Sequence, residues 1–162
     1  MSHLPIDLEN YPGYHIRRLQ QIAVAVFLEE TEEWGVTPVQ YGALSAVSRN
    51  PDIGQRTLAR LIGLDTSTIG SVVDRLEARE LMARKSSPTD RRTWLLSVTP
   101  QGRKLLKNAE PCVLRAQQRM LDPLPQDKRQ LFMEMLAFLT TENDKLARSP
   151  SATPTARPRK KA

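Results

Sequence analysis

The stretch LARLIGLDTSTIGSVVDRLEAREL, residues 58–81, joins a short helical pattern to a longer one across a single glycine. In the longer pattern, apolar residues recur every three or four positions, the spacing of one helix face, at Ile69, Val72, Val73 and Leu76. Gly63 tolerates the left-handed backbone of a sharp turn, and Asp65 or Thr66 can cap the second helix. The stretch therefore predicts a helix-turn-helix whose second helix exposes small polar side chains.

A β-hairpin is predicted directly after the helix-turn-helix. The β-prone runs LMARKS and TWLLSV, at 81–86 and 93–98, are joined by the turn-rich SPTDRR. Thr99 and Pro100 then fit the N-cap and first position of a further helix, which should bend at Pro111. The expected fold is mainly α with a small β wing, a winged helix-turn-helix.

Long amphipathic segments flank this motif. We expect a first helix from Tyr14 to about Trp34, a second from Thr37 to about Asn50, and a last helix over 124–147. The last helix carries more apolar surface than one stripe needs. The first and last helices are therefore expected to pack against a second copy, which predicts a homodimer.

Length and composition set the broad class. The 162 residues suit one domain, and a single cysteine with neither a leader nor an 18-residue apolar run predicts a cytoplasmic protein without a membrane partner. Residues 54–104 contain 10 Lys and Arg against 5 Asp and Glu, a net charge of +5. The basic end at 148–162 is rich in Pro, Ser and Thr and is predicted to be disordered, as either a soluble end or a source of non-specific phosphate attraction.

An arginine-rich hairpin tip beside an exposed polar helix fits duplex DNA. The helix would enter the major groove, while Arg91 or Arg92 reaches phosphates or a narrow minor groove. Asp90 would pair with a neighbouring arginine and orient its guanidinium. The two arginines can also be a solvated surface pair, but their place in the basic, folded segment favours DNA.

The sequence resembles the multiple antibiotic resistance regulator (MarR) family of winged-helix repressors from about Tyr14 to Leu146. The motifs of residues 58–81, the DRR and LSVTPQG stand in the order and spacing of that family. The resemblance implies a dimer that reads a pseudo-palindromic operator in the nucleoid of a bacterium or archaeon. It also implies one MarR-type domain over 10–147, with the winged helix-turn-helix at about 37–99 and dimerisation helices at about 12–34 and 100–147.

The residue roles follow from side-chain chemistry and from the matching positions. The side chains expected at the DNA are Arg56, Thr66, Ser67, Thr68, Ser71, Arg75, Arg84, Lys85, Asp90, Arg91 and Arg92. Arg75 can instead pair with an acid near its own helix, and Arg84 and Lys85 can be backbone contacts or solvated charges. Glu80 stands where the family has glycine, so a left-handed, slightly strained turn is expected there.

Members of this family carry a pocket for small aromatic acids, and the chain offers candidate lining residues. These are Tyr11, Tyr14, His15, Arg18 and Tyr41. A resemblance to the branch that controls nicotinic acid breakdown favours a repressor released by an aromatic or pyridine carboxylate such as a hydroxynicotinate. Alternatively, His15 is an interface or surface histidine and Arg18 an ion-pair partner.

Other functions find little support in the sequence. No nucleophile-base pair, metal-ligand pattern or glycine-rich phosphate loop is present, which argues against an enzyme, a metal or a cofactor. Cys112 is expected to be a buried apolar residue rather than a redox sensor. The competing function is a winged-helix protein-interaction or nucleoid module without an effector.

Overall fold

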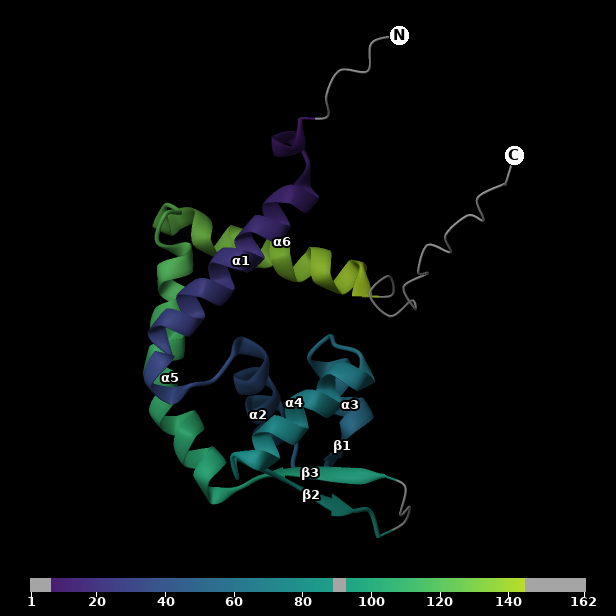
Figure 1. Ribbon diagram of the computed structural model, residues 1–162. Coiled ribbons are helices and arrows are strands. Elements are labelled where there is room, and N and C mark those ends of the chain that lie inside the picture. Colours follow the sequence, from purple (N-terminus) through teal and green to yellow (C-terminus); the bar gives the residue numbers. More distant parts are fainter. Residues whose placement is uncertain (1–6, 89–92, 145–162) are drawn as a thin grey trace, which may run out of the picture. The chain divides into compact units, whose positions relative to one another are not determined.

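The computed structural model describes residues 7–88 and 93–144 (Figure 1). Residues up to Pro123 belong to one compact unit, and the chain from Leu124 onward belongs to a second. The elements of the first unit are η1 (Leu8–Asn10), α1 (Pro12–Glu30), η2 (Glu32–Trp34), α2 (Pro38–Arg49), β1 (Ile53–Gly54), α3 (Gln55–Leu61), α4 (Thr66–Ala78), β2 (Met82–Ser86), β3 (Trp94–Val98) and α5 (Pro100–Leu121). The second unit contains α6 (Gln126–Glu142). The mainly helical fold with a small wing is confirmed.

The predicted helix-turn-helix is formed by α3 and α4. Gly63 turns the chain between them with a φ of 69°, in the left-handed region that a side chain would disfavour. Asp65 is the N-cap of α4, and its carboxylate accepts a 2.8 Å hydrogen bond from the backbone N–H of Thr68. The predicted turn and cap therefore fix where α4 begins.

The wing is an antiparallel sheet with the strand order β1-β3-β2. Met82 lies opposite Val98 and Arg84 lies opposite Leu96, so the hairpin pairs as its alternating sequence predicts. The short strand β1 was not predicted, because two residues carry no readable alternation. Ile53 pairs with Leu96 and extends the sheet on the far side of β3.

The core of the first unit lies between the helix-turn-helix and the sheet. All four apolar residues predicted for the inner face of α4 are buried. The largest fully buried side chains include Leu44 of α2, Leu58 of α3 and Leu96 of β3. Each of these elements contributes side chains to one buried cluster, so apolar packing joins α4 to the sheet.

Helix α1 packs along α5 (Figure 1) and ends earlier than predicted. The hydroxyl of buried Thr31 donates to the Phe27 carbonyl over 2.7 Å, and the chain continues as the 3₁₀ helix η2. Glu30 joins the two helices by accepting from Arg115 over 3.0 Å and from Arg119 over 2.6 Å. Helix α5 stays continuous through Pro111, and its ribbon bends along its length (Figure 1).

Helix α6 buries none of its residues, although it is rich in apolar side chains. Its exposed large apolar residues are Leu131, Met133, Met135, Phe138 and Leu139. The expected extension to residue 147 and the basic end lie partly or wholly outside the described residues. Within the described ranges, none of the helices is both long and apolar enough to cross a lipid bilayer.

Candidate functional site

The outer surface of α4 carries the residues predicted to read DNA. With 100° between successive residues, Ser67 and Ser71 lie opposite the buried face, and both are exposed. Arg75 is exposed on the flank of this surface and has no ion pair within residues 7–88 and 93–144. The alternative that Arg75 pairs with a neighbouring acid is therefore wrong for the described part of the chain.

One of the polar side chains in the first turn of α4 is hydrogen-bonded to the N-cap residue. Thr66 is exposed, whereas the hydroxyl of Thr68 donates to the Asp65 carboxylate. This hydrogen bond, followed by that of the Thr68 backbone N–H, lowers the pKa of Asp65. The hydroxyl proton of Thr68 is thus committed to the cap, so Thr68 can offer DNA only its lone pairs.

Two further cations flank α4. Arg56, in the first turn of α3, is exposed and makes no ion pair with any residue that the structure describes. Lys85 of β2 pairs with Asp52 over 2.7 Å, yet its side chain remains 57% exposed. The side chains of Arg56 and Lys85 are therefore both accessible to solvent.

Arg84 departs from its expected role. Its guanidinium lies 2.7 Å from Asp74 and 2.7 Å from Glu77, both on α4, and its side chain is only 21% exposed. It is neither a solvated charge nor a free cation, because two carboxylates of the same chain already hold it. The guanidinium of Arg84, predicted to contact DNA, is instead held within the protein by Asp74 and Glu77.

The turn from α4 into the wing has the predicted strain. Glu80 adopts a φ of 56°, and its carbonyl accepts a 2.6 Å hydrogen bond from the hydroxyl of Thr99. The same Thr99 caps α5 by accepting from the backbone N–H of Gly102 over 3.0 Å. The predicted contact residues Asp90, Arg91 and Arg92 lie outside the described residues.

The five residues predicted to bind an effector do not meet in the first unit. His15 donates from Nε2 to the Glu9 carbonyl over 2.7 Å, and Arg18 donates to Gln21 over 3.3 Å, both on the exposed start of α1. Tyr11 is also exposed, and Tyr14 stacks edge-on with His15. Arg18 therefore has an amide partner rather than an acidic one.

Tyr41 lies elsewhere, with its ring against Phe27 at a centroid distance of 6.1 Å. Phe27 is twelve residues beyond His15 on the same helix, which is about 18 Å at 1.5 Å per residue. Tyr41 and the residues at the start of α1 therefore cannot line one small pocket of a single protomer.

An open cavity of about 620 Å³ lies beside Tyr41, between α2 and α5. Its lining consists of Tyr41, Ser45, Ser48, Arg49, Arg103, Leu106, Lys107 and Glu110. Burial, reinforced by the Glu110 carboxylate, raises the pKa of Tyr41, so its phenol stays a neutral donor. Except for Tyr41, these residues were not predicted, because the sequence does not show that α5 returns along α2.

Cys112 is buried, as expected for a packed residue. Its thiol lies 3.6 Å from the Glu33 carboxylate and accepts from Arg115 over 3.2 Å. The described residues contain no cluster of three or more metal-binding side chains.

A helix-turn-helix with an exposed polar second helix, followed by an antiparallel hairpin, defines the winged-helix class of DNA-binding proteins. A model of the MarR family matches residues 34–93, from η2 through α4 and β2. The chain belongs to the MarR family and is a transcriptional regulator.

Two relatives are informative. A transcriptional regulatory protein for the hcr operon of Thauera aromatica is 41% identical over 107 residues, which span 65% of this chain and 64% of that protein. The transcriptional repressor NicR of Pseudomonas putida is 26% identical over 136 residues, which span 84% of this chain and 86% of NicR. Both are named as transcriptional regulators and not as enzymes.

Solved structures agree with this fold along most of the chain. The repressor CouR bound to a 23-mer DNA duplex is 31% identical, with a TM-score of 0.77 over 86% of this chain and 99% of CouR. BpsR of Bordetella bronchiseptica, whose DNA binding is regulated by 6-hydroxynicotinic acid, is 26% identical, with a TM-score of 0.79 over 85% of this chain and 98% of BpsR.

Proposed function

We propose that this protein is a homodimeric repressor that reads its operator with α4 and releases it on binding a small aromatic or pyridine carboxylate. The proposed reading of DNA is supported by the side chains on the outer surface of α4. Ser67 and Ser71 are exposed there, and the guanidinium of Arg75 makes no ion pair in the described residues. Hydroxyls suit base edges or phosphates, and an arginine without an internal partner suits a phosphate.

The dimer supplies the second copy of α4 that a pseudo-palindromic operator needs. Exposed apolar side chains on α6, described above, and on α1 support it. On α1 these are Ile16, Ile22 and Leu28, all more than two-fifths exposed. Apolar surface of this extent is stabilised by burial against a partner.

We place the effector in the cavity beside Tyr41. Arg49, Arg103 and Lys107 present three cations to it, which suits a carboxylate, while the Tyr41 phenol can donate to a ring substituent. The regulation of BpsR by 6-hydroxynicotinic acid and the name of NicR as a repressor support this ligand class. The start of α1, with His15 and Arg18, remains a second candidate site, which the partner subunit could complete.

The ligand can act only through a difference in its affinity for the DNA-competent and DNA-incompetent dimers. Leu106 and Lys107 place the cavity on α5, which continues directly from β3 and the wing. A ligand that spreads α2 from α5 would change the spacing of the two α4 helices. Tight binding alone would leave operator affinity unchanged.

The test is a titration of the operator complex with benzoate, hydroxynicotinate and p-coumarate, followed by fluorescence anisotropy. At least one acid is expected to weaken operator binding by about fivefold or more, the lower end of usual coupling energies. Tyr41→Phe and Lys107→Met should weaken this response, whereas Lys128→Met on α6 removes the same charge and should not. Operator affinity that is unchanged by every acid at saturation would contradict the effector proposal and leave the DNA-binding proposal intact.

A further inference from the structure

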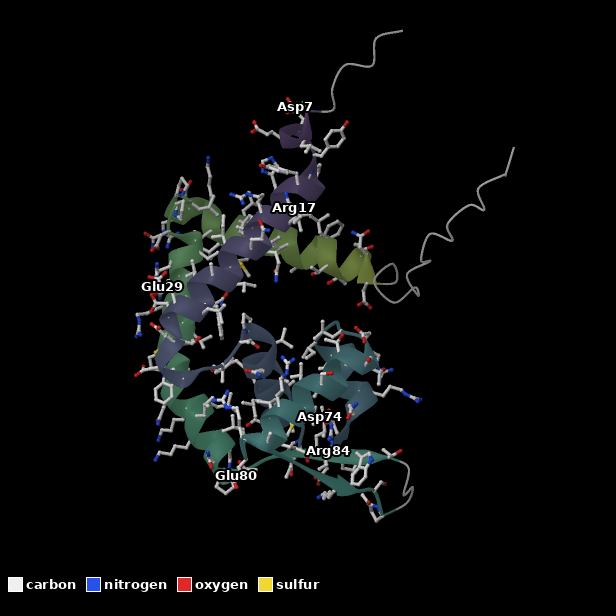
Figure 2. The ribbon with its side chains drawn as sticks, in the orientation of Figure 1. Asp7, Arg17, Glu29, Asp74, Glu80 and Arg84 are labelled. Atoms are coloured by element: carbon white, nitrogen blue, oxygen red, sulfur yellow. The ribbon has the colours of Figure 1, made fainter. Side chains whose placement is uncertain are left out.

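Arg84 connects three elements of the winged helix-turn-helix. From its place on β2, its guanidinium reaches Asp74 and Glu77 on α4 and lies 3.5 Å from the Gln55 side chain on α3. Figure 2 shows the labelled residues Asp74 and Arg84 close together beside α4. The side chain of Arg84 thus joins strand β2 of the wing to α4, the helix proposed to enter the major groove.

Glu77 holds Arg84 at two points. One carboxylate oxygen accepts from the guanidinium over 2.7 Å, and the other accepts from the backbone N–H of Arg84 over 3.0 Å. A planar guanidinium held by carboxylates on a helix has little freedom to rotate, and the bonded backbone N–H fixes the strand as well as the side chain. This contact therefore restrains the direction in which β2 leaves α4 after the left-handed turn at Glu80.

The cluster has the features of an orienting device more than of a stabilising one. Nε of Arg84 is buried and has no hydrogen-bond partner in the described part of the chain. Desolvating a charge and leaving a donor unpaired both offset the gain from the ion pairs. The hydrogen bonds that remain are directional, so the net effect of the cluster is on geometry.

The negative charge of Asp74 allows an orienting role of the cluster to be distinguished from electrostatic repulsion of DNA. Asp74 is 64% exposed on the outer surface of α4, beside Ser67 and Ser71. An exposed carboxylate there opposes DNA phosphates, so electrostatics alone predicts that its removal strengthens binding to every duplex. An orienting role predicts the opposite for the operator, because α4 and the wing must fit adjacent grooves at the same time.

We infer that Arg84, held by Glu77 and Asp74, is a positioning residue for sequence-specific DNA binding that sets the angle between α4 and the wing. It does not contact DNA itself. The inference rests on the proposed reading of the operator by α4, and it adds Glu77 and Asp74 to the residues on which discrimination between sequences depends.

The test uses the full chain and two duplexes, an operator that the wild type selects from a random pool and a scrambled control. Glu77→Gln removes one charge and keeps the shape of the side chain. Its operator affinity should fall about tenfold, the loss typical of one mismatched base pair, while its affinity for the scrambled duplex should stay equal or rise. Asp74→Asn should change both affinities in the same directions by less, since Glu77 still holds Arg84.

Salt dependence separates positioning from phosphate contact. Arg84→Ala should lower operator affinity without changing the slope of log affinity against log salt, whereas a lost phosphate contact reduces that slope by about one. Arg84→Lys should rescue only part of the loss, because an ammonium cannot replace the planar guanidinium. Asp52→Asn, which removes the carboxylate that pairs with Lys85, is the control and should change both affinities alike.

Each outcome has one meaning. Stronger operator binding by Glu77→Gln, or a reduced salt slope in Arg84→Ala, would overturn the positioning role while the wild type still discriminates. A wild type that selects no sequence would overturn the proposed function as well. If circular dichroism finds Arg84→Ala partly unfolded under the assay conditions, Glu77→Gln and Asp74→Asn decide the question.

Discussion

Gly102 should be far less tolerant of a methyl group than another helical glycine of the same chain. It lies in the first turn of α5, beside Leu81 and Val98. A Cβ at this position would stand 2.1 Å from the Leu81 carbonyl oxygen and 2.7 Å from a methyl of Val98. Gly102→Ala therefore cannot be accommodated without moving α5 or the wing.

The magnitude follows from these distances. Ordinary contact begins at 3.4 Å, so the Leu81 carbonyl must move by more than 1 Å, although it is held by a 3.2 Å hydrogen bond from the Thr99 N–H. Overpacking of this kind costs up to about 3 kcal/mol, and the helix propensity of alanine offsets about 1 kcal/mol. The expected loss is about 2 kcal/mol, or about 4–8 °C in Tm for a chain of this size.

Gly42→Ala in α2 is the matched control, because nothing lies within 4 Å of the added Cβ. It should raise the free energy of unfolding by about 0.5–1 kcal/mol through backbone entropy alone. Both variants would be unfolded in urea and by heat at one fixed protomer concentration, since dimerisation makes stability concentration-dependent. Equal effects of the two substitutions, or a stabilised Gly102→Ala, would refute the close packing of α5 on the wing.

Three further perturbations have expected outcomes. Glu80→Gly should raise the free energy of unfolding in urea by up to about 1 kcal/mol by relieving the left-handed turn, and Glu80→Ala should not. Because burial raises the pKa of Tyr41, the contribution of its neutral phenol to stability is present below the ordinary value of 10.0 and is lost as the pH rises above it; Tyr41→Phe should lessen this alkaline loss of stability. Hydrogen bonds from Arg119 and Arg115 lower the pKa of Glu30, so its contribution is present above 4.5 and lost in acid; the stability gap between wild type and Glu30→Gln should close as pH falls, and a constant gap would contradict this.

The elements of the fold were readable because local signals agree with the tertiary structure. The apolar spacing of α4, the turn at Gly63 and the Thr99-Pro100 start of α5 each depend on a few consecutive residues, and each is confirmed. The prediction extended helix α1 beyond Glu30. Apolar spacing does not show that the hydroxyl of Thr31 bonds back to the helix where α1 ends. Glu80 was predicted correctly because its strain depends on the backbone turn alone.

The candidate site was less predictable, because its contacts join residues that are distant in sequence. Arg84 was predicted to contact DNA because the sequence does not show its partners on α4. The carboxylates of Asp74 and Glu77, three positions apart on one helix, were the sequence feature that could have indicated an internal ion pair. The cavity beside Tyr41 forms only because α5 returns along α2. The sequence around Arg103 and Lys107 therefore does not show that these residues line it. The charges and polar residues of the sequence indicated the outer surface of α4. Which of the charged side chains are free of internal partners depends on the tertiary structure.

A hydroxyl-radical footprint, together with affinities for operator and scrambled duplex at one physiological salt concentration, would show whether paired copies of α4 read a DNA sequence. A paired reading of DNA should give two protected half-sites about 10 base pairs apart and a preference of about a thousandfold or more for the operator. Ser71→Ala should reduce that preference while sparing the scrambled duplex. Equal affinity for both duplexes, with protection that follows no half-site spacing, would contradict it.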